Sequence, residues 1–179
     1  MGLSDDPTIR YLAYGSNMWP RRIEQRLGKC DALGVVSLEG FALRFHKRGR
    51  DGSGKCDAFY TGHADDTLYG VVYALSKAQR ELLDDFEGPG YDARELSVRV
   101  PSGVITAYAY VARPEHVDAQ LQPFHWYKAI VIAGARAHCL PGHYIDRLLA
   151  VDSTIDPDAD RETQHQALLH RDNTLRMTR

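Results

Sequence analysis

The chain has 179 residues, of which 44% are hydrophobic and 26% are charged, and its formal net charge is −2 at pH 7. This length suits one domain with a substantial core and is short for two. The balanced charge gives no general attraction to nucleic acid or to anionic lipid, and no apolar run approaches the roughly 18 residues of a membrane-spanning helix. We therefore expect a single domain over residues 1–179, with neither nucleic acid nor membrane as a partner.

The first residues and the cysteines predict a cytoplasmic location. Residues 1–8 predict an N-terminal arm. They lack the basic segment followed by an apolar one that is typical of a secretory signal, so none is expected. Cys30, Cys56 and Cys139 are odd in number, far apart and without CxxC spacing. This pattern favours reduced thiols in a cytoplasmic protein over a disulfide framework.

Residues 9–14 form an apolar, aromatic run that predicts a strand, and Gly15-Ser16-Asn17 ends it abruptly. A helix is then predicted over 21–27, with Pro20 near its first turn and Gly28 at its end. Such a break leaves several backbone N–H groups unpaired and pointing the same way, an arrangement that attracts a carboxylate or a developing oxyanion. Glycine lets a ligand approach the backbone closely. An ordinary helix cap explains Ser16 or Asn17 equally well, so this stretch alone leaves both interpretations open.

The next part of the chain predicts strands with a basic loop between them. Residues 32–45 carry β-type apolar residues broken by Gly34 and Gly40, and 46–55 (HKRGRDGSGK) predict an exposed, glycine-rich hairpin loop with solvated charges. A mobile flap near an anionic ligand is the alternative for this loop.

Residues 49–56 have the GxxxxGK spacing of a nucleotide phosphate-binding loop, but the site is not expected. Cys56 stands where Ser or Thr should bind magnesium, and a thiol is a poor ligand for that ion. A β-like segment follows, whereas the motif needs a helix whose N-terminus meets the phosphates.

Strands are predicted over 57–60 and 67–75, and a helix begins at Lys77 after a capping box formed by Ser76 and Gln79. Its expected apolar positions are Leu82, Leu83 and Phe86, and Gly88-Pro89-Gly90 ends it.

Glu87 is the last residue of this predicted helix. The helix dipole is unfavourable for a carboxylate there, and the neighbouring Asp84 and Asp85 repel it. Both effects raise the expected pKa of Glu87, and a carboxyl group with a raised pKa suits general acid or base catalysis near neutrality. A solvated acidic helix end is the alternative.

The second half of the chain predicts two strands and then helices. Residues 91–100 and 104–112 alternate as strands around the turn at 101–103, and the chain is helical from Trp126, with a break at 140–142. Residues 151–179 predict a peripheral helix or tail around a core over about 9–150. Because strands come first without a βαβ repeat, we predict an α+β fold with a mixed, largely antiparallel curled sheet or small β-barrel flanked by helices.

No metal site is expected. The eight histidines and three cysteines lack the HxxxH and CxxC spacings typical of zinc sites, and Pro141 separates His138 and Cys139 from His143.

Three stretches together resemble the γ-glutamylcyclotransferase-like superfamily, which includes γ-glutamylcyclotransferase, γ-glutamylamine cyclotransferase and AIG2-like proteins. The first is YLAYGSNM, similar to the family's Y-F-A-Y-G-S-N-L signature. The others are DDTLYGVVYALSKAQRELLDDFEG, with its terminal Glu-Gly, and YKAIVIAGARAHCLPGHYIDRL, with its late Tyr and Leu-Pro-x-x-Tyr. With the strands between them, they span about residues 9–150.

The resemblance implies an amide-cleaving enzyme in which the α-amine of a γ-glutamyl group attacks its own γ-carbonyl. The products are 5-oxoproline and an amino acid or amine, and no cofactor or metal takes part. Glu87 matches the family's catalytic glutamate, and Tyr14, Gly15, Ser16, Asn17 and Met18 match the segment that lines the γ-glutamyl pocket. Tyr91 and Tyr127 match two further pocket tyrosines.

The resemblance also has limits. Met18-Trp19-Pro20 departs from the usual continuation of the signature, and Asn17 replaces the Leu that is usual in the glutathione-specific branch, so we place the chain outside that branch. The expected partner is a small γ-glutamyl molecule, and the protein is expected to be a monomer or homodimer. Two other functions stay open: a binding or regulatory module that keeps the pocket without turnover, and an amide hydrolase that uses water as nucleophile.

Overall fold

The structure, a computed structural model, describes residues 8–176, with side chains described as far as Leu169. The predicted N-terminal arm, apart from Thr8, and the last three residues of the predicted tail lie outside the described residues.

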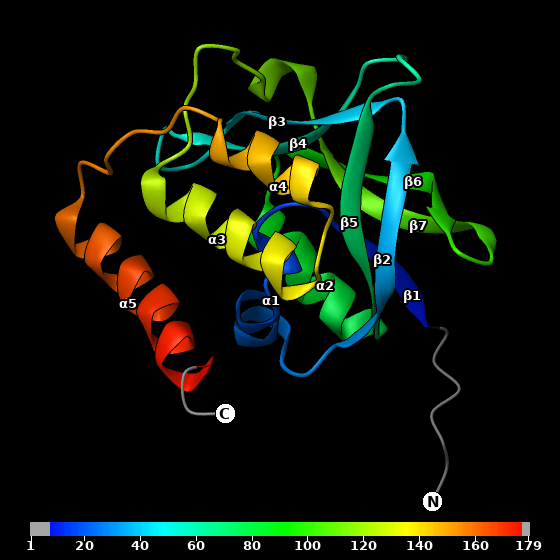
Figure 1. The fold of residues 1–179 in the computed structure, drawn as a ribbon, viewed down its shortest axis with the longest axis horizontal. Coiled ribbons are helices and arrows are strands. Elements are labelled where there is room, and N and C mark those ends of the chain that lie inside the picture. Colours follow the sequence, from blue (N-terminus) through cyan, green and yellow to red (C-terminus); the bar gives the residue numbers. More distant parts are fainter. Residues whose placement is uncertain (1–7, 177–179) are drawn as a thin grey trace, which may run out of the picture.

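The described chain forms seven strands and five helices, with three of the helices following the last strand (Figure 1). The strands are β1 (Ile9–Ala13), β2 (Asp31–Glu39), β3 (Phe41–Arg48), β4 (Gly54–Tyr60), β5 (Thr67–Leu75), β6 (Tyr91–Val100) and β7 (Gly103–Ala112). The helices are α1 (Pro20–Leu27), α2 (Lys77–Glu87), α3 (His125–Ala137), α4 (Gly142–Leu149) and α5 (Ala159–Arg176), with short 3₁₀ turns η1 (Ser16–Met18) and η2 (Pro114–His116).

Five of the strands close into a barrel in the order β1-β5-β2-β6-β7. Neighbouring strands are antiparallel except at the closing pair, where β1 runs parallel to β7 and Tyr11 lies beside Tyr108. β3 and β4 form a separate antiparallel hairpin. This arrangement confirms the predicted α+β fold with a mixed, largely antiparallel barrel.

The 32–45 segment is two strands because its two glycines act differently. Gly40, with φ of +78°, forms the turn between β2 and β3. Gly34, with φ of +145°, lies instead within β2, where the pairing with β5 shifts by a residue. A glycine at such a bulge lets the strand bend without ending it.

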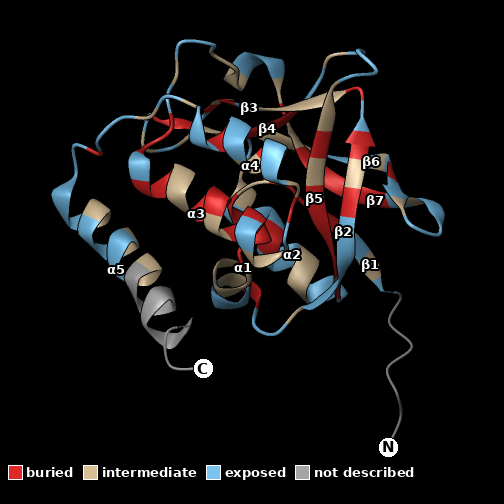
Figure 2. Cartoon of the chain, viewed as in Figure 1, coloured by how far each residue is buried: buried red, intermediate tan, exposed pale blue. Residues whose placement is uncertain are grey.

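Helix α3 is the buried helix of the molecule, and Figure 2 shows its buried residues in red along much of its length. Gly134 in its middle lies against the η1 turn: a Cβ there would be only 2.7 Å from the backbone nitrogen of Trp19. This close approach is open only to glycine, and it fixes the position of the segment that follows β1. Helix α5 lies beside α3 (Figure 1), where His165 stacks on Trp126 with ring centroids 3.8 Å apart.

The predicted capping box at the start of α2 is confirmed. Ser76 Oγ accepts a hydrogen bond from Gln79 N at 3.2 Å, and Gln79 Oε1 accepts one from Ser76 N at 3.0 Å. Gln79 Nε2 also donates to the carbonyl of Lys29 at 2.9 Å, which ties α2 to the end of α1. Because α2 carries Glu87 at its other end, this cap helps to position that carboxylate.

A Ser76→Ala protein is expected to lose about 1 kcal/mol of unfolding free energy, because one backbone N–H at the helix start loses its acceptor. For a chain of this size that loss lowers the melting temperature by roughly 2–4 °C. Thermal unfolding followed by circular dichroism measures it. The control is Ser102→Ala in the exposed β6–β7 turn, which should change the unfolding free energy by less than about 0.5 kcal/mol; equal losses in both proteins would contradict the role of the cap.

Of the three apolar positions expected in α2, only one belongs to the core. Leu83 is fully buried, but Leu82 and Phe86 are each 49% exposed. The helix buries only a narrow face against the barrel, and Phe86 lies at the groove described below, where the Arg26 guanidinium sits 5.1 Å from its ring centroid.

The predicted hairpin over 46–55 is confirmed, but its loop is shorter and less exposed than expected. Only 49–53 turn between β3 and β4, and Lys47 and Ser53 are buried. The hairpin folds back onto the 113–124 segment, where Gly54 N donates to the carbonyl of Gln122 at 2.9 Å. Lys47 and Ser53 are therefore withdrawn from solvent, whereas Arg48 and Arg50 stay exposed. Strand β4 begins at Gly54, so the GxxxxGK stretch leads into a strand and not into the helix that a nucleotide phosphate-binding loop needs.

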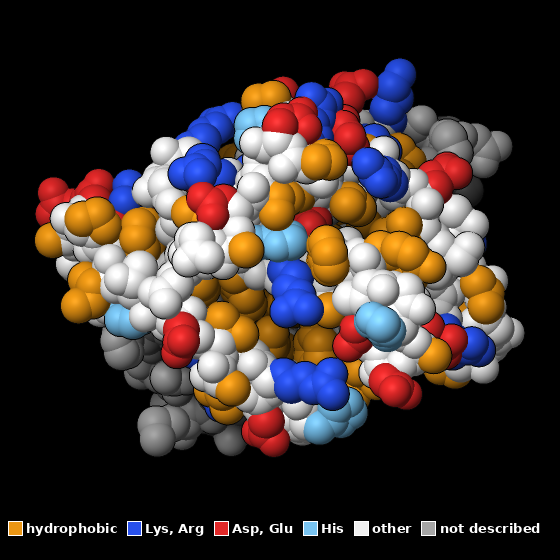
Figure 3. Space-filling view, turned by 90° about the horizontal axis from the view of Figure 1, so that it is seen from above, with side chains coloured by type: hydrophobic (Ala, Val, Ile, Leu, Met, Phe, Trp, Pro, Cys, Tyr) orange, Lys and Arg blue, Asp and Glu red, His pale blue; other side chains and the backbone are white. Residues whose placement is uncertain are grey.

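Over the described residues, no helix combines the length and apolar character needed to cross a membrane. Seen from above (Figure 3), hydrophobic side chains alternate with charged ones, and Lys or Arg side chains border a hollow in this face.

Candidate active site

A pocket of about 300 Å³ lies where β1, η1, β4, the α2–β6 turn, β7 and α3 meet. It brings together seven of the eight residues that the sequence singled out, from three distant stretches. The lining residues are Tyr11, Tyr14, Gly15, Ser16, Asn17, Cys56, Glu87, Tyr91, Tyr110 and Tyr127.

Met18 does not line this pocket, in contrast to the expectation. Its side chain is fully buried on the other side of the η1 turn, against Gly134 of α3. Its carbonyl oxygen accepts a hydrogen bond from Tyr73 Oη at 3.1 Å and pairs with His138 Nε2 at 2.9 Å. Met18 therefore anchors the turn, and the residues before it face the pocket.

Glu87 is held by a short network of side chains. Asn17 Nδ2 donates hydrogen bonds to Glu87 Oε1 and to Tyr11 Oη, both at 3.0 Å. Arg26 Nη1 donates to Asn17 Oδ1 at 2.9 Å and lies 3.5 Å from Glu87 Oε1. Because Arg26 occupies the amide oxygen of Asn17, the amide nitrogen must point toward Glu87. The network thus fixes the position of the carboxylate without using its second oxygen.

The pKa of Glu87 is raised above its ordinary value of 4.5, as predicted, but mainly for another reason. Burial is the largest cause, and it disfavours the charged form. Arg26 is the strongest of the groups that oppose it, followed by the hydrogen bond from Asn17. Asp84, which was expected to repel Glu87, is 47% exposed, pairs with Arg80, and accepts a hydrogen bond from Tyr110 Oη at 2.5 Å.

The η1 turn offers three backbone donors to the pocket. Its internal hydrogen bonds run from Met18 N to the carbonyl of Gly15 and from Trp19 N to that of Ser16. The N–H groups of Gly15, Ser16 and Asn17 make no hydrogen bond to any described residue. This is the donor arrangement that the sequence suggested, and it suits a carboxylate or an oxyanion.

Gly15 is required by a close approach and not by its φ, which is −114°. A Cβ at this position would lie 2.9 Å from Cys56 Cβ and 3.6 Å from Tyr127 Oη. The wall formed by β4 and α3 therefore sits directly against the Gly15 backbone, and any side chain there would fill the pocket.

The pocket tyrosines are neutral, because burial raises the pKa of Tyr11, Tyr14, Tyr91 and Tyr127 well above the ordinary value. Tyr14 Oη donates to the carbonyl of Tyr110, and Tyr91 Oη donates to that of Cys56 at 2.6 Å. Tyr11 Oη and Tyr127 Oη instead accept hydrogen bonds, from Asn17 and from Cys56 N. Their own hydrogens are thus the ones that can turn toward a ligand.

Sequence reasoning missed four residues of the site: Arg26, Tyr11, Cys56 and Tyr110. Tyr11 and Tyr110 were within predicted strands, but which strand face points inward depends on the barrel closure. Cys56 reached the pocket only because the 46–55 segment folds inward. Arg26 carried one signal, a basic residue on a short helix directly after the Gly-Ser-Asn break. Cys56 is not a candidate nucleophile, because burial raises the pKa of its thiol to about 12.

A wider groove of about 1,220 Å³ adjoins the pocket and shares Ser16, Glu87, Tyr91 and Tyr127 with it. The β3–β4 hairpin, α1 and the start of α5 form its walls. Within residues 8–176, no group of three or more His, Cys, Asp or Glu side chains is placed to hold a metal ion.

Comparisons with known proteins agree with this geometry. A model of the AIG2-like family matches residues 67–148. The chain is similar to the gamma-glutamylcyclotransferase of Homo sapiens, with 29% identity over 159 residues that cover 83% of this chain and 81% of the relative. The Mus musculus gamma-glutamylcyclotransferase is 29% identical over 153 residues, covering 81% and 79%.

Solved structures give the same result. A gamma-glutamyl cyclotransferase structure superposes with a TM-score of 0.75 at 27% identity, covering 83% of this chain and 90% of that one. A yeast gamma-glutamyl cyclotransferase specific to glutathione superposes with a TM-score of 0.60 over 79% of this chain and 94% of the yeast chain. At 17% identity, this second likeness shows the fold alone.

Proposed function

We propose that this chain, which is similar to members of the γ-glutamylcyclotransferase-like superfamily, releases 5-oxoproline from a γ-glutamyl amino acid or γ-glutamylamine. The observation that carries the proposal is the pocket itself. A half-buried carboxylate, Glu87, is hydrogen-bonded to Asn17 in the same cavity as the free backbone N–H groups of Gly15, Ser16 and Asn17.

The first step is attack of the substrate's α-amine on its γ-carbonyl carbon. The amine is protonated near neutral pH and must lose a proton before it becomes a nucleophile. Glu87 accepts a proton, and its raised pKa makes it a better base than an exposed carboxylate at the same pH. The reaction is intramolecular, so holding the γ-glutamyl chain in a bent, near-attack geometry supplies much of the rate enhancement.

The second step is collapse of the tetrahedral intermediate. The bond between the γ-carbon and the amide nitrogen breaks, and Glu87 gives its proton to that nitrogen. The ring nitrogen loses its second proton, which the departing amine takes up, and 5-oxoproline and the protonated amine leave. Each donor directed at the charge that builds on the carbonyl oxygen contributes about 3 kcal/mol in comparable sites. We assign this stabilisation to the η1 backbone N–H groups, with the Tyr11 and Tyr127 hydroxyls as further donors to the substrate.

This sequence of proton transfer, addition and elimination at a carbonyl needs no electron transfer and no group carrier, so we propose that it proceeds without a cofactor or metal. The proposed partner is one small γ-glutamyl molecule. A cytoplasmic location agrees with the reduced state of the described cysteines, Cys30, Cys56 and Cys139.

Two alternatives use the same pocket. A non-catalytic binding module would hold a γ-glutamyl ligand without forming product, and an amide hydrolase would use water in place of the amine. The position of Glu87 favours catalysis, because burying a carboxylate whose pKa is raised costs stability that a binding site for an anion does not need.

The proposed function is tested by measuring 5-oxoproline release from a panel of substrates. The panel contains γ-glutamyl-alanine, γ-glutamyl-ε-lysine, a γ-glutamyl-polyamine and glutathione. Release from at least one member supports the proposal. A folded protein that binds γ-glutamyl-alanine but forms no product from the panel would support the binding module instead.

Arg26 is expected to position the site through Asn17 and to tune the pKa of Glu87. In an Arg26→Gln protein the strongest group that lowers this pKa is lost. The pKa of Glu87 then rises further. When the pH is lowered, the active carboxylate form is therefore lost at a higher pH than in the parent protein. The acid limb of the kcat/KM profile should therefore move to higher pH, and the loss of activity relative to the parent protein should be greatest at the acid end of the profile.

Arg26→Lys is the matched control for this prediction, because it keeps the charge but loses the planar donor geometry. It should show a smaller shift of the acid limb than Arg26→Gln. Equal pH profiles for Arg26→Gln and the parent protein would show that Arg26 plays no part in setting the charge of Glu87.

A further inference from the structure

The groove beside the pocket is strongly basic. Seven Lys or Arg side chains line it, whereas Asp51 and Glu87 are the only carboxylates among its described lining residues. This contrasts with the whole chain, whose net charge is −2. A groove in which positive charges predominate, on a protein of nearly balanced charge, points to a negatively charged ligand.

Four of the seven cations already have carboxylate partners. Lys55 pairs with Asp51 at 2.7 Å on the hairpin, and Arg48 pairs with Asp118 at 2.7 Å. Arg26 belongs to the Glu87 network, and the fourth cation is Arg161.

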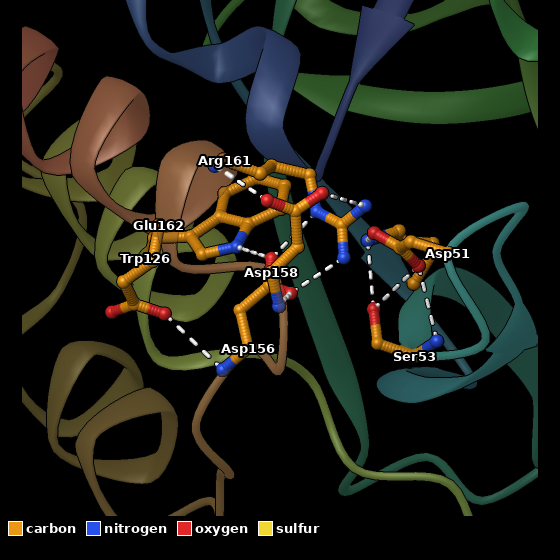
Figure 4. Close-up of polar contacts among 8 residues, drawn as sticks. Asp51, Ser53, Trp126, Asp156, Asp158, Arg161 and Glu162 are labelled. Atoms are coloured by element: carbon orange, nitrogen blue, oxygen red, sulfur yellow. Dashed lines mark hydrogen bonds and ion pairs between the residues drawn. The ribbon is translucent and has the colours of Figure 1, made fainter.

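Arg161, at the start of α5, pairs with Asp156 at 2.5 Å and with Asp158 at 3.5 Å. Figure 4 shows these pairs, with Trp126 donating to Asp156, opposite the cluster of Asp51 and Ser53 on the hairpin. These charges are neutralised within the protein, and they build the walls of the groove.

The other three cations, Arg22, Lys47 and Arg50, form no ion pair with any described residue. Arg22 Nε is buried without a hydrogen-bond partner in the described part of the chain. Lys47 is 7% exposed and lies 4.4 Å from the centroid of the Tyr91 ring. Arg50 reaches across the groove toward the α2–β6 turn, since a Cβ on Gly88 would lie 2.8 Å from its Nη2.

Three unpaired cations around one hollow repel one another, and burying an unpaired donor costs free energy. A ligand with several carboxylates would remove both costs. The inner pocket holds Glu87 and the backbone donors assigned to the γ-glutamyl group. Because pocket and groove share Glu87, Ser16, Tyr91 and Tyr127, the part of the substrate beyond the γ-amide bond must extend into the groove.

Resting on the proposed function, we propose that the groove selects γ-glutamyl substrates whose leaving group carries two or more carboxylates, such as an acidic amino acid. The α-carboxylate of any leaving amino acid neutralises one of the three cations. An acidic side chain neutralises a second, through Lys47 or Arg50 at the rim. A leaving amino acid with a neutral side chain leaves two of the three cations without a carboxylate partner. Cationic polyamines are repelled.

The test compares γ-glutamyl-glutamate with γ-glutamyl-glutamine, which have nearly the same shape and differ by one charge. At low ionic strength, kcat/KM for 5-oxoproline release should be about tenfold higher for γ-glutamyl-glutamate, mostly through KM, because charge-assisted hydrogen bonds hold the extra carboxylate. The ratio should fall as salt is added, since screening weakens attraction at a partly open groove.

Two variants locate the effect. Arg50→Gln and Lys47→Gln should each reduce the preference at least about threefold, and the double variant should bring the ratio close to one. The control is Arg99→Gln, which removes one positive charge from an exposed side chain on β6, outside the groove. It should keep the parent ratio.

The outcomes separate this inference from the proposed function. Equal kcat/KM values for the two dipeptides, with 5-oxoproline formed from both, would overturn the inference and leave the function intact. If neither dipeptide gives product, calorimetry of both with the parent protein decides. Tighter binding of γ-glutamyl-glutamate that is lost in Arg50→Gln then supports the groove while the proposed reaction fails, and equal binding overturns the inference.

Discussion

Replacing Glu87 with Gln is expected to slow 5-oxoproline release by about 100- to 10,000-fold at pH 7, the range attributed to a positioned general acid or base. Gln has nearly the same size and keeps an oxygen that can accept the hydrogen bond from Asn17 Nδ2. The pocket therefore keeps its shape and loses only the proton acceptor. Steady-state kinetics with a γ-glutamyl amino acid measure the loss, and KM should change much less than kcat.

The same protein is expected to be more stable than its parent at neutral pH. Burial raises the pKa of Glu87 in the folded state, so the folded protein holds this proton more tightly than the unfolded chain does. Below the ordinary carboxyl pKa both states are protonated, and the parent and the Glu87→Gln protein should then have similar stabilities. As the pH rises through the folded-state pKa, the buried charge destabilises the parent. The stability advantage of Glu87→Gln should open over this range and then stay constant.

Denaturant unfolding at several pH values measures this difference, with Glu81→Gln as control on the exposed side of the same helix. Glu81→Gln should keep full activity and show no such pH-dependent gain. A Glu87→Gln protein that retained parental kcat would remove Glu87 from the chemistry altogether.

A Gly15→Ala protein is expected to lose at least about tenfold in kcat/KM and about 1–3 kcal/mol of unfolding free energy, the usual cost of overpacking. The added methyl would lie 2.9 Å from Cys56 Cβ and 3.2 Å from its Sγ. The η1 turn must then move away from β4, and its three free N–H groups move with it. Activity and urea unfolding of the same preparation measure both effects.

Two further proteins make this prediction specific. Gly142→Ala is the matched control, because a Cβ at Gly142 meets nothing within 4 Å, and it should be neutral or slightly stabilising. A Gly15→Ala, Cys56→Gly double variant removes the atoms that the methyl strikes, and it should recover part of the lost activity. Full activity of Gly15→Ala alone would contradict the close packing on which this account of the pocket floor depends.

Local patterns in the sequence were enough to predict most elements. The capping box at Ser76, the glycine after Leu27 and the break at 140–142 depend only on nearby residues, and each lies where it was expected. Glu87 and the Gly15–Asn17 turn were likewise visible as interruptions of regular structure.

Contacts between distant parts of the chain were not predictable in the same way. Pairing of β1 with β7 closes the barrel and decides that Tyr11 and Tyr110 face inward. The inward fold of the β3–β4 hairpin depends on α3, α5 and the 113–124 segment, so its charges were assigned to solvent. Arg26 gains its role only because η1, α1 and α2 meet at one point. Met18 was misplaced because a short motif does not show which side of a turn faces the pocket.

The most direct test of the central claim identifies the products of γ-glutamyl-alanine cleavage in water enriched in ¹⁸O. Intramolecular attack by the α-amine predicts 5-oxoproline and alanine in equal amounts, with no ¹⁸O in either, and release at least about 100-fold slower from Glu87→Gln. Glutamate carrying ¹⁸O, released with alanine in equal amounts, would contradict the account, because water would then be the nucleophile.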